Sequence, residues 1–161
     1  MERAIVVTRG RADIAELYTA HAPDARRVAY LLVGDRATAE DITQDAFVRV
    51  LGRFANLRKP EAFRSYLMRT VVSLTKNHHR RRALERRHPE PPASNTLTHE
   101  RDDDLLDALK ELPERQRTAL VLRYCEDLSE HQTAEIMQTS TKAVKSLVTR
   151  GLVALREEVG R

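Results

Sequence analysis

Several residue types are scarce in this chain, and each scarcity excludes a class of protein. The chain has a single cysteine, which excludes an intramolecular disulfide framework and a cysteine-rich metal site. It has no tryptophan. With only three phenylalanines and four tyrosines, we expect a core built from aliphatic side chains. Five glycines, six prolines and almost no alternation of polar and apolar residues make the composition typical of an all-α protein.

Long apolar runs are missing as well. The run at residues 4–7 is too short for the apolar segment of a signal peptide. The run at residues 28–33 is far shorter than the roughly 20 residues that a membrane-spanning helix needs. We therefore expect a cytoplasmic protein with no membrane insertion.

Charged residues of both signs are plentiful but unevenly distributed, and the net charge of +4 hides this division. Residues 1–90 hold 18 basic and 11 acidic side chains, residues 91–135 hold 5 and 11, and residues 136–161 hold 5 and 2. Two basic zones are thus separated by an acidic one. This pattern predicts two separate contacts with a polyanion rather than one diffuse cationic surface.

Apolar residues at steps of three and four predict helices along most of the chain. The expected helices span residues 12–20, 24–33, 37–54, 63–82, 105–112, 113–124, 129–137 and 140–159. Pro23 is expected to interrupt the first two. Gly34 is expected to end the second helix, and Asp35 to cap the third.

Helical periodicity stops after Arg82. Residues 85–101 contain three of the six prolines together with serine, asparagine and threonine, so we expect a flexible linker. It would join two small helical domains at residues 8–84 and 102–161. Three aspartates at residues 102–104 open the second domain, where a helix start explains them better than a metal site does.

The helix expected at residues 63–82 has one apolar and one polar face. Phe63, Leu67 and Val71 belong to the apolar stripe. The polar face carries cations beside short hydrogen-bonding side chains: Arg64, Arg69, Ser73, Lys76, Asn77 and Arg80, followed by Arg81 and Arg82. Cations bind phosphate whatever the sequence, whereas Asn and Ser can hydrogen-bond base edges. The face fits a nucleic acid, although charge alone favours a solvated helix face with a basic tail.

Two helices joined by a tight turn predict a helix-turn-helix near the C-terminus. Ser129 and Gln132 have the spacing of a capping box that opens the first helix. The turn usually contains glycine, so Gln138 would cost about 1 kcal/mol if it took a left-handed conformation, and Ser140 would cap the second helix. Basic and small polar residues fall on the second helix alone: Lys142, Lys145, Ser146, Thr149 and Arg150. This favours DNA binding over an ordinary helical hairpin with a basic solvent face. Gly151 is expected to destabilise that helix by about 1 kcal/mol relative to alanine.

A hydrolase or nuclease that used His78, His79 and the aspartates is a weaker alternative. Adjacent histidines on a helix point in different directions and do not form a metal-binding pair. We expect no catalytic residue, no metal site and no cofactor.

Several motifs together resemble a small bacterial sigma factor of the extracytoplasmic-function group, the type with two domains. They are Ala39–Phe47, Phe63–Leu67, Arg80–Arg82, Leu112–Arg117 and the stretch from Leu128 and Ser129 through Val144–Ser146. Each is moderately specific alone, but their order and spacing extend over nearly the whole chain. The resemblance implies a protein that binds core RNA polymerase, directs it to promoters and promotes melting of the duplex.

The resemblance also implies three binding surfaces. Core polymerase would dock on Asp41, Gln44, Asp45 and Arg49. The minus-ten element would be read as single-stranded DNA by Leu57, Arg58, Ser73, Lys76, Asn77, Arg80, Arg81 and Arg82. The minus-thirty-five element would be read as duplex, in its major groove, by Thr141, Lys142, Lys145, Ser146, Thr149 and Arg150. Tyr66 stands where family members often carry Trp and should fill the core.

A helix-turn-helix regulator that binds duplex DNA without polymerase is the alternative. It leaves the Asp41 surface and the 63–82 helix unexplained. Sigma factors of this group are commonly held inactive when free, so the resemblance also admits an anti-sigma factor as a partner.

Overall fold

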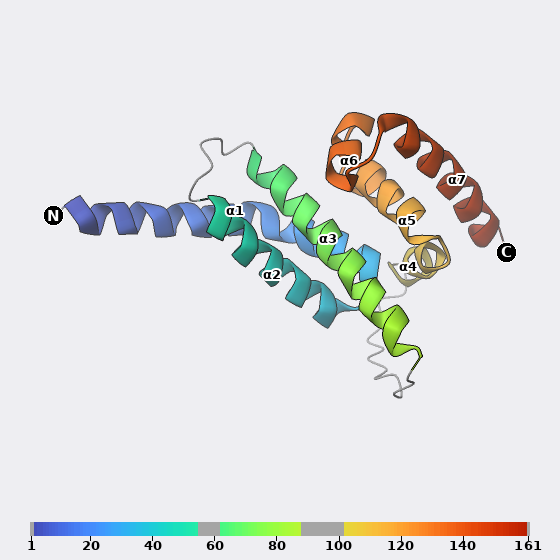
Figure 1. Cartoon of the computed structure of the whole chain (residues 1–161), viewed down its shortest axis with the longest axis horizontal. Coiled ribbons are helices and arrows are strands. Elements are labelled where there is room, and N and C mark those ends of the chain that lie inside the picture. Colours follow the sequence, from blue (N-terminus) through green and yellow to red (C-terminus); the bar gives the residue numbers. More distant parts are fainter. Residues whose placement is uncertain (1, 55–61, 88–101, 161) are drawn as a thin grey trace.

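The computed structural model describes residues 2–54, 62–87 and 102–160, with side chains at 14–53, 62–87 and 104–160. The described residues form two groups of helices and no strand, which confirms the all-α fold (Figure 1). The first group contains α1 (Glu2–Val33), α2 (Arg36–Phe54) and α3 (Ala62–Glu85). The second contains α4 (Asp102–Lys110), α5 (Glu114–Leu120), a π-helix η1 (Val121–Cys125), α6 (Glu130–Met137) and α7 (Thr141–Val159). Most of the expected linker, residues 88–101, lies outside the described residues.

Helix α1 runs through Pro23 without a break, so the predicted interruption is wrong. A proline inside a helix removes one hydrogen bond and costs about 3 kcal/mol. Here Ala22, Ala25 and Val28, in the turns around the proline, are buried in the core of the first group. Burial of this face on α2 and α3 offsets the lost hydrogen bond and keeps the helix continuous.

The core of the first group is where the apolar faces of its three helices meet. Phe47 of α2 and Phe63 of α3 are buried, with ring centroids 5.9 Å apart. Leu67 and Met68 are fully buried beside them. Tyr66 does not fill this core: it is 38% exposed, and the prediction that it would is wrong. The buried stripe of α3 is rotated from the expected one, so that Met68 takes the inner position and the larger Tyr66 lies at the rim.

Local signals place the helix ends as predicted. The side chain of Asp35 accepts from the amide of Thr38 at 3.0 Å, as an N-cap does. The capping box is complete, because Gln132 N donates to Ser129 Oγ at 3.0 Å and Ser129 N donates to Gln132 Oε1 at 2.9 Å. Gln138 takes the left-handed conformation with φ 54°. These contacts confirm the helix-turn-helix geometry of α6 and α7.

Gly151 of α7 has a packing role that its expected helix penalty does not describe. The residue is buried, and a Cβ atom there would lie 2.9 Å from Cδ1 and 3.1 Å from Cγ of Leu120 in α5. Leu120 is itself only 4% exposed, so it has little room to yield. The missing side chain therefore allows α7 to approach α5 closely.

The single helix expected at residues 113–124 is instead two segments. The α-helical hydrogen bonds of α5 end at Leu120, and the chain continues as η1, with the wider turn of a π-helix. The amide of Glu126 closes this turn by donating to Val121 O at 3.2 Å. Asp127 then takes a positive φ of 51°. Periodicity in the sequence does not reveal such a turn, because the apolar spacing barely changes over five residues.

Candidate nucleic-acid interface

The polar face of α3 is exposed from Ser73 onward, whereas Arg64 and Arg69 near its start are half-buried. Six of the residues predicted to bind the minus-ten element lie on it and are exposed: Ser73, Lys76, Asn77, Arg80, Arg81 and Arg82. They stand opposite the buried stripe of Phe63, Leu67 and Val71, as the helical periodicity predicts. The other two, Leu57 and Arg58, lie outside the described residues.

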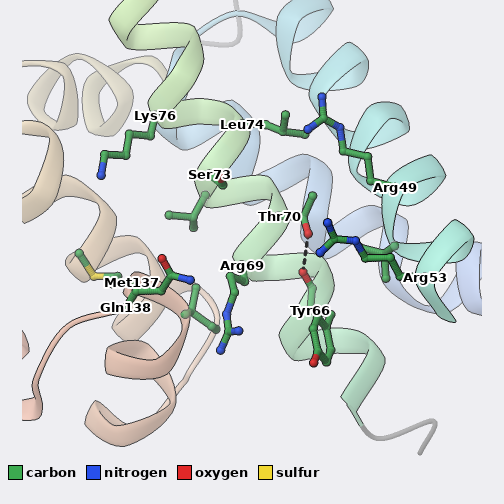
Figure 2. A pocket seen from close by; sticks show the side chains of 13 residues that line it. Arg49, Arg53, Tyr66, Arg69, Thr70, Ser73, Leu74, Lys76, Met137 and Gln138 are labelled. Carbon is green, nitrogen blue, oxygen red and sulfur yellow. Dashed lines mark hydrogen bonds between the residues drawn. The ribbon is translucent and has the colours of Figure 1, made fainter. Parts of the chain in front are cut away.

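A cleft of about 570 Å³ lies along this face, between α2, α3 and α6 (Figure 2). Four cations line it: Arg49 and Arg53 from α2, and Arg69 and Lys76 from α3. The described residues around the cleft include no acidic side chain. A groove of this kind attracts a phosphate backbone, and apolar side chains in its wall offer contacts to bases.

Tyr66 and Arg69 lie together at one end of the cleft. The Arg69 guanidinium is 5.7 Å from the centroid of the Tyr66 ring, within the range of a cation–π contact. Sequence reasoning placed Tyr66 in the core and left Arg69, Thr70 and Arg53 out of the predicted site. Arg69 could have been included, because it belongs to the same polar face as Ser73.

The predicted minus-ten residues divide between two clefts. Ser73 and Lys76 line the first cleft. Arg81 and Arg82 line a second one of about 360 Å³, next to Asp41 and Asp45 of α2. Asn77 and Arg80, although exposed on the same helix, line neither.

The two histidines of α3 have different surroundings. His79 Nε2 lies 2.8 Å from the carbonyl oxygen of Leu32, at the end of α1. Burial lowers the pKa of His78, and the nearby His79, Arg82 and Arg81 lower it further, so the ring is neutral at pH 7. Among the described residues, no three His, Cys, Asp or Glu side chains come together as metal ligands do.

The residues predicted to dock on polymerase form an exposed strip along α2: Asp41, Gln44, Asp45 and Arg49. Asp45 Oδ1 pairs with Arg49 Nε at 3.0 Å, and Gln44 Nε2 donates to Glu40 Oε1 at 3.3 Å. Glu40 is in turn held by Arg26 of α1. These contacts along α2 therefore fix the side chains that lie beside the carboxylates of the strip.

The outer face of α7 carries the residues predicted to read the minus-thirty-five element. Thr141, Lys142, Lys145, Thr149 and Arg150 are exposed, whereas Ser146 is half-buried. Opposite them Val144 is fully buried and holds the helix in its group. The Lys145 ammonium lies 3.7 Å from the carboxylate of Glu130 in α6. A phosphate that bound Lys145 would replace this exposed and therefore weak ion pair.

No helix in the described part of the chain is long and apolar enough to cross a bilayer. The helices of both groups are amphipathic. Their charged faces point outward, and their apolar faces meet inside.

Comparisons with known proteins agree with this arrangement. The family model "Sigma-70 region 2" matches residues 17–85, and "Sigma-70, region 4" matches residues 102–155. The RNA polymerase sigma factor SigV of Bacillus subtilis is 31% identical over 150 residues, which cover 91% of this chain and 90% of SigV. The RNA polymerase sigma-E factor of Streptomyces coelicolor is 35% identical over 138 residues, covering 83% of this chain and 78% of that protein.

Among solved structures, the sigma factor RpoE of Bartonella quintana, in complex with the anti-sigma factor NepR, has the same fold. The TM-score is 0.77 at 20% identity, over 92% of this chain and 97% of that one. The two family models together span both helical groups, and the similarity to SigV runs through both. The chain therefore belongs to the sigma-70 family, as an RNA polymerase sigma factor of the extracytoplasmic-function group.

Proposed function

We propose that this sigma factor directs core RNA polymerase to promoters through three surfaces, on α2, α3 and α7. The observation that carries the proposal is the pair of basic helical faces on α3 and α7, each on its own group of helices. One face borders an open cationic cleft, and the other lies on the second helix of a helix-turn-helix. Two contacts of different kinds suit a promoter that is read at two separate elements.

The α3 face is proposed to bind the minus-ten element as a single strand. A protein promotes melting only if it binds the separated strand more tightly than the duplex. The cleft suits that preference, because cations for phosphates lie beside Tyr66 and Ser73, which can contact an unstacked base. Asn77 is proposed to read a base edge, and Arg80, Arg81 and Arg82 to hold the flanking phosphates. Leu57 and Arg58 are proposed to complete this site.

The α7 face is proposed to read the minus-thirty-five element in the major groove. The helix begins at Thr141, and the N-terminal turns of a recognition helix are the part that reaches base edges. Thr141, Lys142, Ser146 and Thr149 would supply short contacts there. Lys145 and Arg150 add charge, and each can bind either a phosphate or a guanine edge.

The α2 strip is proposed to dock on core polymerase. Its exposed residues, Asp41, Gln44, Asp45 and Arg49, lie on the side of α2 away from the buried Ala46 and Val50. Carboxylates in this position steer association with a basic partner. The domains are proposed to divide as residues 8–84 and 102–161, with residues 85–101 between them.

The remaining assignments follow from this role. Because a sigma factor acts with core polymerase, we propose that the chain works in the cytoplasm as a binding subunit rather than as an enzyme, and without a cofactor. An anti-sigma factor is a further proposed partner, by analogy with the complex of RpoE and NepR, which shares the fold.

The test is transcription by purified core polymerase with and without this protein, followed by sequencing of the transcripts. We expect new start sites that share two upstream elements. Footprinting without polymerase distinguishes a sigma factor from the alternative, a helix-turn-helix regulator. A helix-turn-helix regulator would protect duplex DNA alone and fail to bind core polymerase, and that result would refute the proposal.

A further inference from the structure

We infer that Arg53, at the end of α2, is a further contact for the phosphates of the melted strand. None of the three proposed surfaces includes this residue. The strand would then lie between α2 and α3, with cations on both helices, rather than along the exposed side of α3 alone. This inference rests on the proposed role of α3 as the helix that binds the minus-ten element.

Arg53 lies in the last turn of α2, and its side chain is exposed. Together with Arg49, one turn earlier, it lines the cleft of about 570 Å³ between α2, α3 and α6. Figure 2 shows both side chains extending from α2 toward α3. Because Arg69 and Lys76 of α3 line the same cleft, cations reach it from two helices.

The place of Arg53 at a helix end offers another reason for a cation at this position. The last turn of a helix carries partial negative charge, so an arginine is favourable there whatever it binds. Among the described residues, however, Arg53 donates no hydrogen bond to a carbonyl group of α2. Its side chain lines the cleft instead. The helix end favours a cation here but does not explain the direction of the side chain.

The charges around Arg53 suit the binding of an anion. Arg49 is paired with Asp45, four residues earlier on the same helix, at 3.0 Å. The residue four positions before Arg53 is Arg49, and like charges at this spacing repel each other. In the described part of the chain Arg53 has no carboxylate partner, and no acidic side chain lines the cleft. A bound phosphate would offset the repulsion and pair with Arg53.

The second cleft has a different balance of charge. There Arg81 and Arg82 lie with three carboxylates, those of Asp41, Asp45 and Glu85. The carboxylates repel a polyanion and so offset the attraction of the two arginines. The strand therefore gains most in the first cleft, and Arg81 and Arg82 hold the phosphates that flank it.

The sign of the charge changes along α2 itself. Asp41 and Asp45 belong to the strip that is proposed to dock on polymerase, and Arg53 lies roughly two turns beyond Asp45. Because of this separation, a substitution of Arg53 should leave the docking of polymerase intact. The two proposed contacts of α2 can therefore be tested independently.

The test measures binding of a fluorescent single-stranded oligonucleotide of mixed sequence, about 12 nucleotides long, to the full chain at a series of KCl concentrations. Each phosphate contact with a single strand adds about 0.7 to the slope of log affinity against log salt concentration. The variant is Arg53→Gln, and Arg53→Lys keeps the charge. The matched control is Arg36→Gln, which removes an exposed arginine at the other end of α2, outside both clefts.

We expect Arg53→Gln to lower the slope by about 0.7 and to weaken binding several-fold at low salt, because one phosphate contact is lost. Arg53→Lys and Arg36→Gln should both keep the full slope. Circular dichroism checks that each variant is folded, and a purely structural role of Arg53 would not change the slope.

Four results would overturn the inference. They are a full slope in folded Arg53→Gln, an equal fall in Arg36→Gln, a fall in Arg53→Lys as large as that in Arg53→Gln, and no binding of the oligonucleotide by the unsubstituted chain.

Measurements with core polymerase separate this result from the proposed function. Arg53→Gln should bind core polymerase as the unsubstituted protein does, and should initiate more weakly at every promoter. If the contact is right and the function wrong, the slope falls although neither protein directs initiation. If the function is right and the contact wrong, both proteins direct initiation equally and have the same slope.

Discussion

Single side chains on α3 differ in what they can recognise. An amide such as Asn77 has a donor and an acceptor on one plane and can distinguish bases, whereas a guanidinium such as Arg81 binds any phosphate. Both residues are exposed on the same helix, four positions apart. Because they share a face but differ in chemistry, Asn77 and Arg81 form a matched pair for comparing base recognition with phosphate binding.

We expect Asn77→Ala to change which minus-ten sequences are used, because a base contact is lost. Arg81→Ala should instead weaken all promoters together and reduce the salt dependence by about one charge. Transcription from a library of minus-ten variants at two salt concentrations measures both effects. If the two variants gave the same uniform loss, Asn77 would not be a base reader.

Asp35 is a second residue whose role is local. Hydrogen bonds from the hydroxyl and the amide of Thr38 lower the pKa of its carboxyl. Because the folded pKa lies below the unfolded one, the stabilisation is present above the unfolded value of about 4 and is lost as the pH falls.

We therefore expect Asp35→Ala to lower the free energy of unfolding by about 1 kcal/mol at pH 7. The difference from the unsubstituted protein should shrink as the pH drops below about 4. Urea titrations at pH 7 and at pH 3 test this. Asp35→Asn, which keeps an N-cap acceptor, serves as the control and should cost less at pH 7.

At the scale of elements, α7 combines a packed face with a binding face. Gly151 and Val144 lie on the packed face, and Lys145 and Arg150 lie on the binding face. Substitutions on the two faces should therefore have different effects, one on the stability of the domain and the other on its affinity for DNA.

We expect Lys145→Ala or Arg150→Ala to weaken binding to a minus-thirty-five element by roughly 1–3 kcal/mol without unfolding the protein. Leu152→Asp, on the partly buried side, should unfold the second group, because it places a charge against the core. Affinity for promoter duplex and thermal melting measure the two outcomes. Unchanged binding in folded Lys145→Ala and Arg150→Ala would remove α7 as the reading helix.

Two glycines in helices provide a further contrast. A Cβ at Gly52 of α2 meets nothing within 4 Å, whereas one at Gly151 would lie 2.9 Å from Leu120. Gly52→Ala should raise the free energy of unfolding by about 0.4–1 kcal/mol. Gly151→Ala should lower it, because strain in the core outweighs the gain in helix propensity. Denaturant unfolding measures both changes. An equal gain in the free energy of unfolding at the two sites would contradict the close approach of α7 and α5.

For the whole molecule, the arrangement of the two helical groups decides which surfaces are available. The α2 strip and the outer face of α7 are exposed, while the α3 cleft is shared with α6. Asp41 and Asp45 also border the cleft that contains Arg81 and Arg82, so the proposed polymerase and DNA surfaces adjoin one another.

We expect the double variant Asp41→Arg, Asp45→Arg to lose binding to core polymerase, because like charges would face a basic partner. Its helix content should barely change, since exposed substitutions usually cost within about 0.5 kcal/mol. The matched control is Glu111→Arg with Glu157→Arg, two exposed acids of the second group. Pull-down of core polymerase at low salt is the measurement. Capture at the unsubstituted level by the folded double variant would refute the docking assignment.

Much of the fold could be predicted from the sequence, because it depends on contacts within about four residues. The helix from Ser140 onward and the capping box at Ser129 depend on local contacts, and the structure confirms both. The polar face of α3 follows from the 3.6-residue period in the same way. Family motifs in order along the chain were then enough to identify a sigma factor.

The tertiary structure alone decided what depends on residues far apart in the sequence. Pro23 is accommodated by the packing of α1, Tyr66 lies at the rim because Met68 fills the core, and Gly151 meets Leu120 of another helix. The pairing of Glu126 with Arg27 and Arg64 has no local signal, since the residues approach only when the two helical groups pack. Helical periodicity determines which face of each helix is apolar, but the partner of a face depends on how the helices pack in three dimensions.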